Sequence, residues 1–65
     1  MNGVELRIEM LKKNIGVKAL CKKIDMKPAT FYRKLRAGTF DQGNIASIRD
    51  ALDLSMEDIK RIFLP

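Results

Sequence analysis

The feature that most constrains this chain is the short distance between two helical patterns within residues 16–38, GVKALCKKIDMKPATFYRKLRAG. In both patterns apolar residues recur at the four-residue spacing that places them on one face of a helix. Pro28 suits the first position of a helix, and it pushes the residue before it into an extended conformation. We therefore predict one helix over 17–24, a second over 28–37, and a tight turn between them.

Similar spacings elsewhere predict three more helices and no strand. These cover about 4–14, about 42–52, and a segment that begins at Ser55. In the first of them, Leu6, Met10 and Leu11 are expected on or near one face. The sequence has no repeat, low-complexity segment or Pro/Gly-rich linker. The five helices are therefore expected to share one core, as one compact all-α domain over residues 1–65.

Local capping signals support several of these boundaries. Gly38 is suited to end the helix before it, because glycine enters the left-handed region without strain. Asp41 is a good N-cap for the next helix. Ser55 and Asp58 form a variant of the capping box, with aspartate in place of the usual glutamate.

Positive charge is concentrated in one part of the chain. The formal net charge is +5. Residues 1–38 carry ten basic and three acidic side chains, a net charge of +7, whereas residues 39–65 carry three basic and five acidic ones, a net charge of −2. One-sided positive charge is expected of a surface that binds phosphate groups. The alternative is a soluble domain whose scattered lysines are only solvated.

The composition excludes several other classes of protein. One cysteine allows no disulfide within the chain, and without any histidine it leaves too few ligands for a metal site. Cys21 is therefore expected to be a small buried residue. No group of side chains has the makeup of a catalytic site, so we expect neither an enzyme nor a cofactor. No apolar run reaches the roughly 18 residues that a membrane span needs, and the N-terminus lacks signal-peptide character.

The outward side of the predicted helix 28–37 carries two arginines that can bind DNA. At about 100° per residue, the side opposite Phe31 and Leu35 carries Arg33 and Arg36. Arginine can donate two hydrogen bonds to guanine O6 and N7, the commonest specific contact with a base. The pattern thus predicts a helix that enters the major groove and reads base edges.

Smaller and polar side chains nearby add further contacts. Ala29 lets the backbone approach closely, and its methyl group can touch a thymine methyl. Tyr32 can stack or donate a hydrogen bond to a phosphate, and Thr30 can also donate to a phosphate. In the preceding helix, Lys18 and Lys22 lie opposite the apolar residues and are expected to hold phosphates. A solvated lysine face accounts for these two lysines equally well.

The segment LCKKIDMKPATFYRKLRAG resembles the helix-turn-helix of Cro- and phage-repressor-type regulators, the XRE superfamily with the lambda-repressor-like fold. The tail GTFDQGNIASIRDALDLSMEDIKRIF is similar to the fourth and fifth helices of small phage regulators from Gram-positive hosts. The resemblance implies a five-helix lambda-repressor-like domain with a central helix-turn-helix. Such a domain would bind a double-stranded DNA operator in the cytoplasm of a bacterial host. The positions that it implies face DNA are Lys27, Pro28, Ala29, Tyr32, Arg33 and Arg36.

Three residues depart from the pattern of that family. Asp25 stands where the family has a turn glycine, and aspartate enters the left-handed region more readily than most residues. Val17 stands where a glutamine often contacts phosphate. Pro28 stands where a glutamine often reads a base, and proline has no side-chain donor. Base reading must then rest more on Lys27, Tyr32, Arg33 and Arg36.

Three functional hypotheses follow. The first is a sequence-specific transcriptional regulator that binds double-stranded DNA, a Cro-like repressor of a phage or prophage. The second is a protein-interaction module of the same fold, directed at another regulator or a polymerase, with only weak nonspecific DNA binding; Val17 and Pro28 support it. The third is a nonspecific nucleic-acid or RNA binder, which ranks last because the chain has four aromatic residues and no evident stacking platform.

The C-terminal residues bear on assembly. Ile62, Phe63 and Leu64 cannot all point inward from one short helix. An exposed pair among them would provide a homodimer contact, and the two copies would then read half-sites about 34 Å apart, one helical turn of DNA. The equally supported alternative is that these residues fray over the core.

Overall fold

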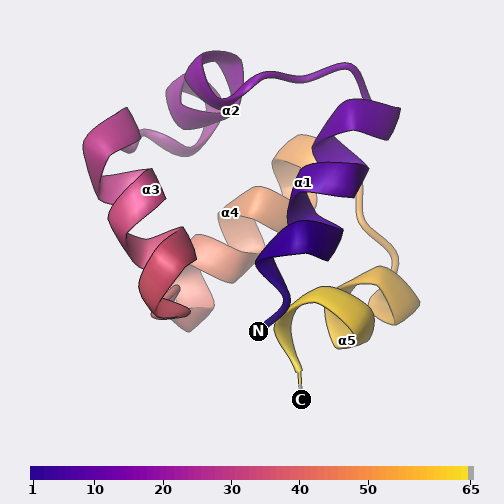
Figure 1. Ribbon diagram of the computed structural model, residues 1–65. Helices are drawn as coiled ribbons and strands as arrows, with labels where there is room; N and C mark the ends of the chain where they lie inside the picture. The colour runs from indigo at the N-terminus through magenta and orange to yellow at the C-terminus, as the bar shows by residue number, and fades with distance from the viewer. Residues whose placement is uncertain (65) are drawn as a thin grey trace.

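Five α-helices and no strand make up residues 1–64, the part of the chain that the computed structural model describes (Figure 1). The helices are α1 (Gly3–Lys12), α2 (Val17–Ile24), α3 (Pro28–Ala37), α4 (Gln42–Leu52) and α5 (Met56–Phe63). The predicted all-α, five-helix fold is confirmed. Pro65, the last residue of the predicted domain, lies outside the described residues.

The predicted bounds of α2, α3 and α4 coincide with the observed ones, because strong local signals set them. Pro28 opens α3, and Gly38 ends it in the left-handed conformation at φ 69°. The side chain of Asp41 accepts the backbone N–H of Asn44 at 2.7 Å and caps α4. The first helix is shorter than predicted, since α1 ends at Lys12.

A capping box begins α5, as the sequence predicted. Ser55 is the N-cap, and its hydroxyl oxygen accepts the backbone N–H of Asp58 at 3.1 Å. The carboxylate of Asp58 accepts the backbone N–H of Ser55 at 3.0 Å. The hydrogen bond from the Ser55 backbone is the main cause that lowers the pKa of Asp58 below its ordinary value, and the Ser55 side chain is the second cause. Two reciprocal hydrogen bonds between Ser55 and Asp58 therefore fix the start of α5.

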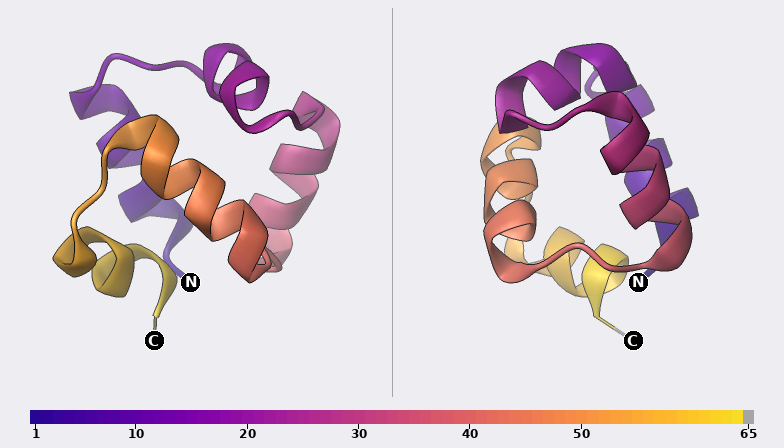
Figure 2. Two further views of the ribbon diagram at one scale, coloured as in Figure 1. Left: turned by 180° about the vertical axis from the view of Figure 1, so that it is seen from behind. Right: turned by 90° about the vertical axis from the view of Figure 1, so that its left-hand side faces the viewer.

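The helices enclose one core, to which each contributes. Helix α4 packs against α2, α5 packs against α1, and the start of α1 lies beside the end of α5 (Figures 1 and 2). The fully buried side chains are Leu6, Leu20, Phe31, Ile48, Leu52 and Ile62. Phe40 continues this core, with its ring centroid 5.5 Å from that of Phe31 and 6.4 Å from that of Phe63.

Two expectations about apolar residues are wrong. Leu11 does not join Leu6 and Met10 on the buried face; its side chain is 79% exposed, because at about 100° per residue it projects from the side of α1 away from Leu6. Ile62 and Phe63 are both buried in the core of the single chain, so they form no exposed pair. Of the three residues predicted as a possible homodimer contact, only Leu64 remains exposed. These three residues therefore do not provide the exposed apolar pair that the predicted homodimer contact requires.

An ion-pair network joins the outer sides of α1 and α5. Arg61 lies at its centre, with its guanidinium 2.7 Å from Glu9, 3.2 Å from Glu5 and 3.2 Å from Asp58. Glu9 is only 4% exposed, and the ammonium of Lys12 lies 3.4 Å from the same carboxylate oxygen. The buried charge of Glu9 is therefore compensated from two helices.

Candidate nucleic-acid interface

The turn between α2 and α3 has the tight geometry that the sequence predicted. Asp25 follows α2 in the left-handed conformation, at φ 55° and ψ 51°, and its backbone N–H donates to the carbonyl of Cys21. The next residue, Met26, donates its N–H to the same carbonyl at 3.0 Å. Lys27 is extended, and α3 starts directly at Pro28. The turn thus fixes where α3 begins relative to α2.

Helix α3 buries one side and exposes the other. Phe31 is fully buried and Leu35 is half-buried against the core. Ala29, Arg33 and Arg36 are exposed, as the helical pattern predicted. The outward side of α3 is therefore free to approach another molecule.

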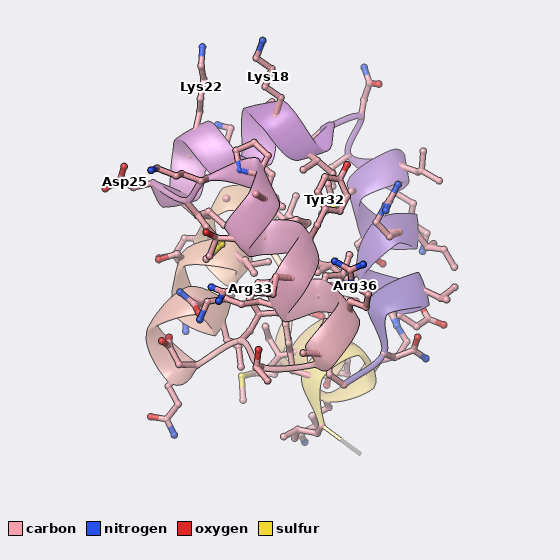
Figure 3. All side chains as sticks on the ribbon, turned by 60° about the vertical axis from the view of Figure 1, so that its left-hand side comes forward. Lys18, Lys22, Asp25, Tyr32, Arg33 and Arg36 are labelled. Carbon is pink, nitrogen blue, oxygen red and sulfur yellow. The ribbon has the colours of Figure 1, made fainter. Side chains whose placement is uncertain are left out.

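The two arginines of α3 extend in different directions. In Figure 3, Arg33 extends toward the α4 side of the molecule, whereas Arg36 lies on the side of α1. Within residues 1–64 neither guanidinium takes part in an ion pair, so the donors of both are available to acceptors outside the chain. A helix with arginines on both flanks can reach both edges of a groove.

Tyr32 is anchored on one side and open on the other. Its ring meets the ring of Phe31 edge-on at 6.1 Å, and it lines a shallow depression together with Leu35 and Arg36. Tyr32 is exposed, and Figure 3 places it on the α1 side of α3. Thr30 is half-buried, which leaves it less accessible to a phosphate than the sequence suggested.

A basic groove runs between α2 and the start of α3. Three lysines line it, together with Cys21, Met26 and Pro28 and the carboxylate of Asp25. The lysines are Lys18, Lys22 and Lys27. In Figure 3, Lys18 and Lys22 point in the same direction away from the body of the molecule. The groove therefore presents three ammonium groups beside one carboxylate.

Cys21 lines the basic groove and is buried in the core, as predicted. It is buried against the apolar cluster. Burial raises the pKa of the thiol, so the uncharged form is favoured. Across residues 1–64 no three His, Cys, Asp or Glu side chains gather in a way that could hold a metal ion.

The fold and the exposed basic helix agree with a comparison against known protein families. The family model of the Cro/C1-type HTH DNA-binding domain matches residues 5–62. The chain belongs to this family. The match runs from α1 nearly to the end of α5. Nearly the whole fold described above is therefore a Cro/C1-type DNA-binding domain. A search of curated proteins and a search of solved structures each gave no match.

Sequence reasoning missed one surface feature of the Cro/C1-type domain. Val4, Ile8 and Leu11 form an exposed row on α1, which we call the α1 stripe. The signal was present in the sequence, since a spacing of four and then three residues defines a helical face. In the described part of the chain, no helix is long and apolar enough to cross a lipid bilayer.

Proposed function

We propose that this chain is a sequence-specific transcriptional regulator that inserts α3 into the major groove of double-stranded DNA. The observation that carries the proposal is the exposed side of α3, where Arg33 and Arg36 project without ion-pair partners in residues 1–64. Two unpaired guanidinium groups on an exposed helix suit bidentate contacts with guanine. A helix-turn-helix that ends in such a helix suits insertion into the groove.

The proposal assigns two kinds of contact to the surrounding side chains. Contacts with base edges are assigned to Lys27, Pro28, Ala29, Tyr32, Arg33 and Arg36. Contacts with phosphates are assigned to Lys18, Lys22 and Thr30. The lysine-lined groove supports the second group, because closely spaced ammonium groups attract the DNA backbone whatever its sequence.

Within this class we propose a Cro-like repressor encoded by a phage or prophage. The support is the similarity of residues 38–63 to the last two helices of small phage regulators. A protein of this kind works on DNA in the cytoplasm of a bacterial host, where it occupies an operator and so controls a promoter.

One observation favours a second candidate, a protein-interaction module of the same fold. Pro28 stands at the first position of α3 and offers no side-chain donor to a base. If base reading fails for this reason, the domain would bind DNA only through phosphates, and another regulator or a polymerase would be its partner. Such binding would be equally weak on every sequence and would fall steeply with salt.

Selection from a random duplex library at near-physiological salt distinguishes the two functions. The wild type, Arg33→Ala and the control Lys60→Ala, which removes an exposed cation from α5, are selected in parallel. The proposal expects a defined motif for the wild type and the control. It expects Arg33→Ala to lose about 1–3 kcal/mol of binding free energy on that motif and to relax specificity at one position. No enriched motif, with binding that collapses as salt rises, would favour the protein-interaction module.

A further inference from the structure

The α1 stripe is an apolar surface that the core of this chain does not use. Val4 is 70% exposed, Ile8 38% and Leu11 79%. At about 100° per residue these three side chains project within roughly 60° of one another, on the side of α1 opposite Leu6. Helix α1 therefore has two apolar sides, one packed on the core and one that residues 1–64 leave exposed.

Charged residues border the α1 stripe on both sides. Glu5 and Lys12 lie seven residues apart along the margin nearest α5, where Glu5 also contacts Arg61. Arg7 lies along the other margin, which adjoins α3: the backbone at Gly3 comes close to Leu35 of α3. The two margins therefore differ: the one nearest α5 carries a negative and a positive charge, and the one beside α3 carries Arg7.

We propose that the α1 stripe binds the α1 stripe of a second copy of this chain, with the two α1 helices antiparallel. The stripe suits a copy of itself because Ile8 lies near its middle. Antiparallel pairing about Ile8 brings Val4 of each copy against Leu11 of the other. The same pairing brings Glu5 of each copy opposite Lys12 of the other, so that opposite charges meet on that margin. Self-complementarity of this kind defines a two-fold interface.

The direction of the two-fold axis connects this interface with DNA, and at this step the inference rests on the proposed function. In an antiparallel helix pair the two-fold axis is perpendicular to both helices, and it points from one margin of each helix toward the other margin. One margin of α1 adjoins α3, so both copies would direct α3 toward the same side. Figure 3 shows α1 flanking α3 at the edge of the surface that carries Tyr32 and Arg36. Two copies would then read a palindromic operator.

The size of the stripe predicts how strong this pairing is. A stable dimer buries about 800 Å² on each partner, contributed by roughly 20–30 residues. Three apolar side chains with their charged margins provide much less. The free protein is therefore expected to pair weakly, and adjacent half-sites on DNA are expected to raise the effective concentration enough for the pair to form.

Cysteine crosslinking of the free protein tests the interface without DNA. Ile8→Cys places a thiol at the proposed two-fold axis, and Met56→Cys is the control, because Met56 on α5 is more exposed, at 64%. Random collisions would oxidise the Met56→Cys thiol at least as fast. The proposal expects Ile8→Cys to form disulfide-linked dimers at least tenfold faster at equal concentration. It also expects Val4→Gln with Leu11→Gln to remove that advantage. Equal or slower crosslinking of Ile8→Cys would overturn the proposal.

A second measurement uses DNA selected by the wild type and counts the copies bound. The variant with Val4→Gln and Leu11→Gln is expected to bind one half-site as tightly as the wild type and to lose cooperative binding of the second copy. Unchanged cooperativity would overturn the interface. If the library yields no motif, the proposed function fails, whereas the crosslinking of the free protein still decides the pairing.

Discussion

The guanidinium of Arg61 lies 2.7 Å from the carboxylate of Glu9, although 52 residues separate them in the chain. Glu9 is buried, so this contact brings a charge from α5 to a carboxylate that water hardly reaches. A buried carboxylate without a partner is costly, because the protein interior solvates charge poorly. The contact therefore joins the first helix to the last.

Removing Arg61 is expected to destabilise the fold strongly. Arg61→Ala leaves Glu9 buried with only the longer contact from Lys12, and we expect a loss of about 3 kcal/mol in the free energy of unfolding. Arg49→Ala breaks the exposed pair between Arg49 and Asp50 and should cost less than about 1 kcal/mol. Urea denaturation of both variants measures the difference. Equal losses would show that the pair with Glu9 contributes no more than a surface pair.

Neutralising Asp25 is expected to strengthen DNA binding. Asp25→Asn removes the single carboxylate among the residues that line the lysine-rich groove, and asparagine also tolerates the left-handed conformation. Binding should tighten severalfold at low salt on every sequence, and the gain should shrink as salt screens the charge. Asp53→Asn is the matched control, because Asp53 has nearly the same backbone conformation, at φ 53°, after α4. An equal gain for both variants would mean that net charge alone, and not the groove, is responsible.

Stability is expected to fall in acid through the capping box of α5. The pKa of Asp58 is lower in the folded chain than its ordinary value, so the carboxylate contributes stability above the ordinary pKa of about 4 and loses it as the pH falls through the folded pKa. Asp58→Asn should flatten the decline in the free energy of unfolding below about pH 4. Asp50→Asn removes an exposed carboxylate outside the box and is the control. Urea titrations at a series of acidic pH values give the two slopes, and identical slopes would contradict the prediction.

Lys18 and Arg33 are expected to act on DNA in different ways. Lys18→Ala should weaken binding about equally on all sequences and reduce the slope of log K against log salt by about 1, because one phosphate contact is lost. Arg33→Lys keeps the charge but loses the planar fork, so it should weaken the selected motif more than unrelated DNA. Salt titrations on both kinds of duplex separate the two effects. A sequence-dependent loss for Lys18→Ala would move Lys18 from the phosphate group to the base-edge group.

Local signals made most of the fold predictable from the sequence. Pro28, Gly38 and Asp41 each fix a chain conformation within a few residues, so the bounds of α3 and the start of α4 follow without knowledge of the rest of the molecule. The exposure of Ala29, Arg33 and Arg36 follows from the helical period once Phe31 is taken as buried. The side of α3 that faces outward was therefore predictable as well.

Contacts between distant segments determined what could not be predicted. Helix α1 has two apolar faces, and only packing against the rest of the core decides that Leu6 is buried and Leu11 exposed. The burial of Glu9 depends on Arg61, which lies in the last helix. Likewise, Ile62 and Phe63 fill the core from the end of α5, which a local pattern could not establish.

The meeting of the chain ends has a practical consequence. The backbone N–H of Asn2 donates to the carbonyl of Ile62 at 2.6 Å, and Figures 1 and 2 show the start of α1 and the end of α5 at the side of the molecule away from α2. Polypeptide joined to either end would therefore leave from one place, at a distance from Lys18 and Lys22. An affinity tag, a fluorescent protein or a second domain can be fused at either end, and the basic side of α2 stays unobstructed.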